Sequence, residues 1–271
     1  MSGTQLRLDR LFDKKSGKSV IIALSNAMYF GPTPGMQNND DIRKVVTGAV
    51  DGNCDGVMVT PGGLRANLDL FSGRGGPAII LSAGYTSSWR PTDRFGGGGS
   101  AHRMSTITSV EDALRMGADA YHIYSFLGWK DPDREAEELG LLGRVCEEAR
   151  ACGLPVICEP LARGDAVDPK DYNSTENVAL MARLASEVGA DVVKVEYTGS
   201  PESFGTVVEA SHAPVVMMGG AKTDTYDEFL TFLDGAMSSG ARGVAVGRNV
   251  YSQDNAAEAV SRAAAVVHKQ K

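Results

Sequence analysis

The sequence predicts a single (β/α)8 barrel (TIM barrel) formed by all 271 residues. Short apolar runs alternate with amphipathic helical patterns along the whole chain, as expected of a parallel α/β fold. Eight such units in roughly 250 residues favour a closed barrel over an open doubly wound sheet. No interdomain linker interrupts the pattern, so we expect one domain over residues 1–271.

Eight apolar, β-branched runs are the expected strands. They are nearly continuous in apolarity, which is typical of parallel strands covered by helices. The runs are 20–24, 56–60, 78–82, 120–124, 155–159, 192–197, 214–218 and 243–247.

The clearest helical patterns begin with capping residues or end at a glycine. The segment 109–119 begins with a Ser-x-x-Asp cap and 174–191 begins with Ser-Thr. Glycines end the segments 109–119, 174–191 and 225–241, and 134–153 has apolar residues at helical spacing. The glycine-rich segment FGGGGS (95–100) follows the third strand and lacks the spacing of a dinucleotide motif. We expect it to be a flexible lid that orders when substrate binds.

Composition excludes several classes of function. The net charge is −7 with no basic tract, which argues against nucleic-acid and anionic-membrane partners. No apolar run approaches 18 residues and the amino terminus lacks a signal-like apolar stretch, so we expect a cytoplasmic protein. The four cysteines form no CxxC pair and no zinc-like cluster with histidine, so we expect free thiols, no metal and no cofactor.

The sixth strand carries a lysine where an active site is expected. In this fold the site lies at the carboxyl ends of the strands. Side chains alternate along a strand, so Lys194 and Glu196 are predicted to point into the barrel together. Burial disfavours a charged amine, and a neutral amine is what Schiff-base formation needs. The alternative is a structural Lys–Glu ion pair inside the barrel.

Glycines follow the seventh and eighth strands, in MMGGAKTD (217–224) and VAVGRNVY (244–251). Backbone N–H groups without neighbouring side chains can approach an anion closely, and phosphate sites often form after these two strands. Gly219, Gly220, Gly247 and Arg248 are the predicted phosphate ligands, with Arg248 able to bind in a bidentate manner. The alternative is that the glycines only form tight turns.

Other strand ends carry candidate acids, bases and ligands. Glu159 closes the fifth strand and is a candidate acid or base near Lys194, or else a salt-bridge partner of Arg163 or Lys194. Tyr124 and His122 alternate inward on the fourth strand, where a tyrosine could relay a proton or simply pack in the core. The first strand leads to a further pair of candidate substrate ligands, Ser25 and Asn26.

These motifs together resemble a known family. The segments 194–224 and 240–254 resemble the archaeal-type class I (Schiff-base) fructose-bisphosphate aldolases. Related enzymes include the amino-dideoxyheptulosonate synthases and the autoinducer-2 thiolase, and more distantly the tagatose-bisphosphate and sulfofructose-phosphate aldolases. The resemblance covers nearly the whole chain, from the GPTPG loop to GRN. It implies that Lys194 of K-x-x-Y-T-G forms the Schiff base and that the two glycine loops hold a substrate phosphate. It also implies a homo-oligomer, often a decamer in this family.

The sequence departs from the family pattern at two places. Ser25, Asn26 and Ala27 stand where the family usually has Asp-His-Gly. Leu161 stands where the fructose-bisphosphate and heptulosonate enzymes have a tyrosine, whereas Glu159 matches a glutamate of the tagatose and sulfofructose relatives. The lysine and phosphate parts are thus kept and the proton-transfer parts changed, so a specialised reaction is expected rather than glycolytic cleavage.

The expected function is therefore that of an aldolase (a lyase) acting on a small phosphorylated carbonyl compound. Lys194 would capture a phosphorylated ketose or a donor like dihydroxyacetone phosphate, with Glu159 or Tyr124 moving protons. Two alternatives remain at this point: a thiolase or other acyl-transfer enzyme on the same scaffold, and a phosphometabolite-binding protein without catalysis.

Overall fold

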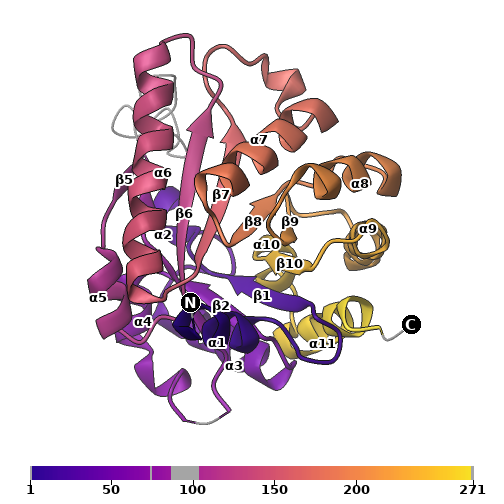
Figure 1. Cartoon of the computed structure of the whole chain (residues 1–271). Coiled ribbons are helices and arrows are strands. Elements are labelled where there is room, and N and C mark those ends of the chain that lie inside the picture. Colours follow the sequence, from indigo (N-terminus) through magenta and orange to yellow (C-terminus); the bar gives the residue numbers. More distant parts are fainter. Residues whose placement is uncertain (1, 74, 87–103, 270–271) are drawn as a thin grey trace.

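The computed structural model describes residues 2–73, 75–86 and 104–269, and these residues form the predicted TIM barrel (Figure 1). The parallel strands close in the order β1-β10-β9-β8-β7-β6-β3-β2, with helices around the outside. The barrel strands are β1 (Ser19–Ala23), β2 (Gly56–Val59), β3 (Ala78–Ser82), β6 (Ala120–Leu127), β7 (Val156–Ala162), β8 (Val192–Val195), β9 (Val215–Met218) and β10 (Gly243–Val246).

Helices follow the barrel strands, and a small antiparallel pair is added after β3. That pair is β4 (Gly84–Tyr85) with β5 (Ser105–Thr106). The α-helices are α1 (Ser2–Leu11), α2 (Ala27–Phe30), α3 (Asn39–Asp51), α4 (Pro61–Ala66), α5 (Val110–Arg115), α6 (Pro132–Cys152), α7 (Thr175–Val188), α8 (Pro201–Ala210), α9 (Tyr226–Ser238), α10 (Arg248–Tyr251) and α11 (Ala256–Val267). Two short 3-10 turns are η1 (Leu68–Leu70) and η2 (Pro169–Asp171).

The capping residues position the helices as the sequence predicted. The Ser109 hydroxyl accepts a hydrogen bond from the backbone N–H of Asp112 at 3.1 Å, and Ser174 does the same for Asn177 at 3.3 Å. Each bond satisfies one of the free N–H groups at a helix start. Gly189 ends α7 in the left-handed conformation, which glycine adopts without steric cost.

Strands β6 and β7 extend farther than the sequence predicted. The two strands pair from Tyr121–Val156 to Leu127–Ala162, several residues beyond the predicted ends at 124 and 159. Leu127 and Ala162 are buried against Met181 of α7, so the extension has a small core of its own. In contrast, β8 ends at Val195, two residues earlier than expected.

The amino-terminal helix α1 seals one end of the barrel. Leu11 is fully buried and packs, with Leu8, in a cluster of side chains that point into the barrel. Its Cδ1 lies 3.3 Å from where a Cβ on Gly56 would stand, at the first residue of β2. Arg10 adds an ion pair to Asp119 at 2.8 Å. This end is therefore filled, and any open site must lie at the other end.

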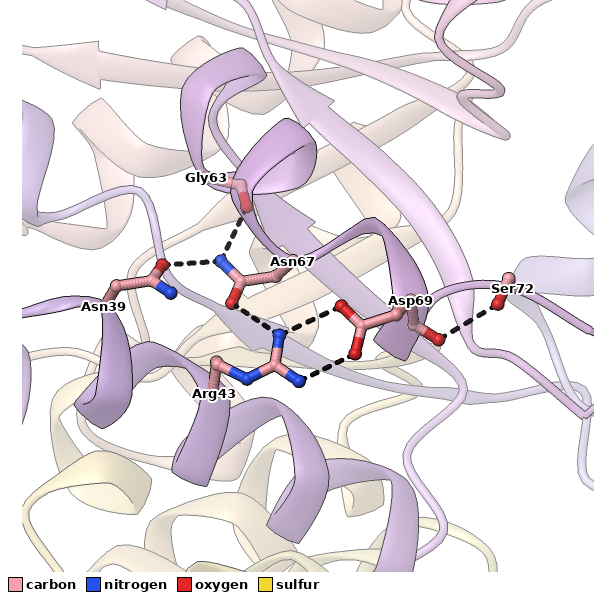
Figure 2. A network of polar contacts seen from close by, with 6 residues as sticks. All are labelled: Asn39, Arg43, Gly63, Asn67, Asp69 and Ser72. Carbon is pink, nitrogen blue, oxygen red and sulfur yellow. Dashed lines mark hydrogen bonds and ion pairs between the residues drawn. The ribbon is translucent and has the colours of Figure 1, made fainter.

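A polar network on the outside connects α3 with the segment around η1 (Figure 2). The buried Asn67 amide donates to the Asn39 side chain and to the Gly63 carbonyl, both at 2.9 Å. Arg43 pairs with Asp69 through both guanidinium nitrogens, at 2.9 and 2.7 Å. These bonds satisfy the buried Asn67 amide, since a buried polar group needs hydrogen-bond partners.

Among the residues that the structure describes, no helix has both the length and the apolarity needed to cross a lipid bilayer.

Candidate functional site

A pocket lies among the carboxyl ends of the strands, opposite the end sealed by α1. It contains eight of the nine residues predicted as catalytic groups or substrate ligands, the exception being Ser25. The pocket is lined by Ala23, Asn26, Tyr29, Phe30, Tyr124, Glu159, Lys194, Met218, Gly219, Gly220, Ala245, Gly247 and Arg248.

Lys194 and Glu159 form a buried ion pair at the base of this pocket. In the ladder between β7 and β8, Ile157 pairs with Val192. Two residues further along each strand, Glu159 and Lys194 therefore face inward side by side. The Lys194 ammonium donates a short hydrogen bond to Glu159 Oε2, and the side chains are only 6% and 4% exposed.

The pKa of Glu159 lies below its ordinary value. Burial raises the pKa of this carboxyl, but the nearby charge of Lys194 and a hydrogen bond from His122 outweigh burial. Glu159 is therefore a carboxylate at neutral pH when the lysine is charged.

His122 lies behind Glu159 and contacts the same oxygen. Its Nε2 is 3.2 Å from Glu159 Oε2, and its Nδ1 is 3.1 Å from the hydroxyl of Ser82. Burial lowers the pKa of His122, and the bond to Glu159 opposes this effect without reversing it. The imidazole is therefore neutral at pH 7. The inward position of His122 was predicted, but its contact with Glu159 was not.

Two tyrosines form the wall next to this cluster. The rings of Tyr124 and Tyr29 meet edge to face, with centroids 5.5 Å apart. The Tyr29 hydroxyl donates to the Gly84 carbonyl at 2.7 Å. Burial raises the pKa of both phenols above 10, and the charge of Glu159 adds to this effect. Both therefore remain protonated and are able to donate.

The glycine loops approach each other at the opposite wall of the pocket. A Cβ on Gly219 would lie 2.7 Å from a methyl group of Val246, and one on Gly247 would lie 2.6 Å from the Ala23 carbonyl. Gly220 has a φ of +65°, which favours glycine. The Gly219 N–H donates to the Ala245 carbonyl at 2.9 Å, so it is already used within the barrel. Gly219 thus allows close packing, whereas Gly220, Gly247 and Arg248 remain the candidate anion ligands.

Asn249 holds the two loops together. Its side-chain amide donates to the carbonyls of Gly219 and Ala221, at 2.8 and 2.9 Å. Its oxygen accepts from the N–H and the hydroxyl of Thr223, both at 3.0 Å. The side chain is buried and makes four hydrogen bonds, so it fixes the loop after β9 against α10.

The remaining predicted ligands differ in their placement. Asn26 lies in the pocket and donates to the Tyr251 hydroxyl at 3.0 Å. Arg248 is exposed at the rim, free to approach an anion from outside. Ser25 is buried at 2% exposure and is not part of the pocket wall. It lies against Tyr124, whose pKa it tends to lower.

The predicted placement of Glu196 beside Lys194 is wrong. Glu196 follows the last residue of β8, so the strand alternation no longer applies to it. Both of its oxygens accept from Arg163, at 2.9 Å. Arg163 therefore pairs with Glu196, and Glu159 is left to pair with Lys194. The predicted lid at 95–100 lies outside the described residues.

A family model matches most of the chain. Residues 22–253 match the model described as the DeoC/LacD family aldolase. The chain belongs to the DeoC/LacD aldolase family. Membership makes it an enzyme of the aldolase type, which confirms the class predicted from the sequence.

Relatives in this family cover almost the whole chain. It is 34% identical to an uncharacterized aldolase of Saccharolobus solfataricus, over 99% of this chain and 96% of the relative. It is 32% identical to the 2-amino-3,7-dideoxy-D-threo-hept-6-ulosonate synthase of Halobacterium salinarum, over 98% of this chain and 92% of the relative. It is 33% identical to the class 1 fructose-bisphosphate aldolase of Thermoproteus tenax, over 91% of this chain and 88% of the relative.

Solved structures of similar proteins share the fold. A crystal structure of an archaeal fructose 1,6-bisphosphate aldolase has a TM-score of 0.83 and 30% identity, covering 98% of this chain and 99% of the other. A second structure shows an archaeal fructose-1,6-bisphosphate aldolase with the catalytic lysine covalently bound to the carbinolamine intermediate of the substrate. It has a TM-score of 0.83 and 28% identity, covering 98% of this chain and 100% of the other.

Three site residues carried no predicted role although signals for them exist. His122 shares the inward face of β6 with Tyr124, so the alternation already indicated its direction. Ser82 pairs directly with His122 in the ladder between β3 and β6, but that register joins segments 40 residues apart. Asn249 is the third residue of the G-R-N motif, and only the folded loops reveal what it binds.

Proposed function

We propose that this aldolase is a class I enzyme in which Lys194 forms a Schiff base with a phosphorylated ketose or a donor like dihydroxyacetone phosphate. The contact between Lys194 and Glu159 inside the pocket carries the proposal. A lysine kept at this depth beside a carboxylate has a direct acceptor for the proton that it must lose.

Capture of the substrate begins with transfer of that proton to Glu159. The neutral amine of Lys194 attacks the ketone carbon, and a proton moves from nitrogen to oxygen to give a neutral carbinolamine. Protonated Glu159 then donates to the carbinolamine hydroxyl. Water leaves, a cationic iminium forms and Glu159 is again a carboxylate.

Cleavage of the carbon–carbon bond uses the same carboxylate as a base. Glu159 removes the proton from a hydroxyl group of the substrate. This hydroxyl is on the carbon of the breaking bond that leaves as the aldehyde. That oxygen becomes an aldehyde, and the electrons of the broken bond move into the iminium to give an enamine. Protonation of the enamine carbon by Glu159 or Tyr124, followed by addition of water, releases the ketone and restores Lys194. Condensation follows the same steps in reverse.

The phosphate of the substrate is proposed to bind between the glycine loops. Gly220 and Gly247 bring backbone N–H groups to the pocket wall without intervening side chains, and Arg248 supplies a positive charge at the rim. One relative supports a phosphorylated substrate, since it is named as a fructose-bisphosphate aldolase.

We further propose that the chain forms one barrel domain and acts as a homo-oligomer in the cytoplasm. The resemblance to the archaeal-type class I aldolases, in which homo-oligomers are common, supports association of barrels. Light scattering coupled to size-exclusion chromatography tests this proposal, and a mass of one chain (28.6 kDa) at micromolar concentration would contradict it.

Borohydride trapping tests the Schiff base. The protein is incubated with dihydroxyacetone phosphate and sodium borohydride, and the adduct is mapped by mass spectrometry. We expect one reduced adduct on Lys194 and none in Lys194→Met. The control Lys170→Met removes an exposed lysine, whose side chain is 74% accessible, and should keep the adduct.

Three results would overturn the proposal. An adduct that persists in Lys194→Met would assign the imine to another lysine. Absence of any adduct in a protein that still binds dihydroxyacetone phosphate would exclude the Schiff-base mechanism. A reaction that proceeds only with coenzyme A would favour acyl transfer instead.

A further inference from the structure

Three side chains form a buried line that leads to the reactive lysine. Ser82 and His122 are completely buried and Glu159 is 3% exposed. They lie on adjacent strands, β3, β6 and β7, and each contacts the next. Nothing in the proposed reaction requires Ser82 or His122 to touch the substrate. Burial of their polar groups is costly unless they are hydrogen-bonded, and the line of contacts to Glu159 supplies those bonds.

We propose that His122 is a positioning residue that holds Glu159 by a hydrogen bond from its neutral imidazole, in the tautomer that leaves Nδ1 to accept from Ser82. This inference deepens the proposed function and rests on it. A carboxylate can only accept, so the Nε2 of His122 must carry the proton that is donated to Glu159. A neutral imidazole then has an unprotonated Nδ1, which accepts from the Ser82 hydroxyl.

The charges around Glu159 support a neutral imidazole. One positive charge, on Lys194, already balances the carboxylate, and a charged His122 would add a second buried cation with no partner. Burial accordingly lowers the pKa of His122. Several titratable groups act electrostatically on Glu159 or are affected by its charge. They are Lys194 on β8, Glu196 just past it, His122 and Tyr124 on β6, Cys158 on β7 and Tyr29 on α2.

The contact matters most when the lysine is no longer charged. Lys194 and His122 both bind Oε2 of Glu159, which leaves the other oxygen of this pocket residue for the substrate. In the carbinolamine and the enamine, the lysine nitrogen is neutral and binds the carboxyl only weakly. At these stages His122 is the remaining donor to Oε2, so it keeps the carboxyl oriented while protons move.

Two substitutions separate the hydrogen bond from simple packing. His122→Phe removes the donor and keeps a ring, whereas His122→Gln restores an N–H donor. In His122→Phe we expect kcat to fall roughly 10- to 100-fold, the usual range for loss of a partner behind a reactive group. Loss of the donor also destabilises the carboxylate, so the acidic limb of the pH profile of kcat should move to higher pH. KM should change little, and Lys194 should still be trapped by borohydride.

The conservative variant decides the interpretation. His122→Gln should recover most of kcat and return the acidic limb towards its original position. If His122→Gln is as slow as His122→Phe while both unfold at the temperature of the unaltered protein, the donor is not what matters and the proposal is wrong. Unchanged kcat and pH profile in His122→Phe would also overturn it.

Nitrogen-15 NMR of histidine-labelled protein tests the tautomer without any enzymatic activity. We expect Nε2 of His122 to be protonated and Nδ1 unprotonated at pH 7, with Ser82→Ala altering the Nδ1 shift. A protonated Nδ1 or a doubly protonated ring would overturn the inference. This result is independent of borohydride trapping, so failure of the Schiff-base proposal and failure of the positioning proposal are distinguishable.

Discussion

At the scale of single residues, His122 and Glu159 connect the chemistry of the site to the stability of the protein. The pKa of His122 in the folded protein lies below the ordinary value of 6.5, because of burial. The unfolded chain therefore binds more protons than the folded one as the pH falls below that value, and acid favours unfolding. Glu159 acts in the same direction at lower pH, since its stabilisation is complete above 4.5 and is lost as the pH falls through its folded value.

This linkage predicts that the pH dependence of stability is weaker in His122→Gln. A single histidine of this kind removes up to about 1.4 kcal/mol of unfolding free energy for each pH unit below its ordinary pKa. Urea unfolding at pH 7.5, 6.5 and 5.5 measures this slope. The slope from pH 6.5 to 5.5 should be smaller in the variant, and equal slopes would contradict a neutral buried His122.

Rules that depend only on neighbouring residues in the sequence predicted part of the site. Alternation placed Lys194 inside the barrel, and the end of β7 placed Glu159 near it. The partner of the lysine could not be predicted with certainty, because it depends on where β8 ends and on Arg163, which takes Glu196 away. Contacts between neighbouring strands depend on register, which a single sequence does not specify.

At the scale of elements, Asn249 makes the loop after β9 and the helix α10 one unit. Asn249→Ala would leave the carbonyls of Gly219 and Ala221 and the N–H of Thr223 without this partner. We expect a loss of roughly 1–3 kcal/mol in unfolding free energy, as for other buried groups left unpaired. Because the loop would no longer be held against α10, affinity for inorganic phosphate should fall on the order of tenfold, or about 1.4 kcal/mol.

The network of Figure 2 provides a matched control for this prediction. Asn67 is equally buried and also donates two side-chain hydrogen bonds, but it is not part of the pocket wall. Asn67→Ala should therefore cost a similar amount of stability and leave phosphate affinity unchanged. Thermal unfolding and calorimetric titration with phosphate measure the two effects. Equal loss of phosphate affinity in both variants would show that Asn249 acts only through global stability.

Elements with strong local signals were predicted well. The caps at Ser109 and Ser174 and the left-handed Gly189 are each determined within a few residues. The ends of β6 and β7 were predicted too early, because their last residues are stabilised by pairing with each other and by α7. The β4–β5 pair was not predicted, since two residues per strand leave no periodic pattern.

At the scale of the whole molecule, closure of the barrel followed from counting strand–helix units, but the role of the first helix did not. The sequence before the first strand contains no motif that marks it as part of the core. Only the folded barrel reveals that this end needs a cover, which Leu8, Leu11 and Phe12 supply. The two ends of the barrel are therefore specialised, one for stability and the other for chemistry.

This division predicts that Leu11→Ala destabilises the protein without altering the reaction. Leu11 is completely buried against the barrel interior, so its truncation should cost about 2–5 kcal/mol of unfolding free energy. Leu6 lies on the same helix and is 66% exposed, so Leu6→Ala should change stability by no more than about 0.5 kcal/mol. Below the unfolding transition, both variants should keep the KM for the phosphorylated substrate and the yield of the reduced adduct on Lys194. If Leu11→Ala raises KM at temperatures where it is fully folded, the two ends of the barrel are coupled and the separation of stability from chemistry does not hold.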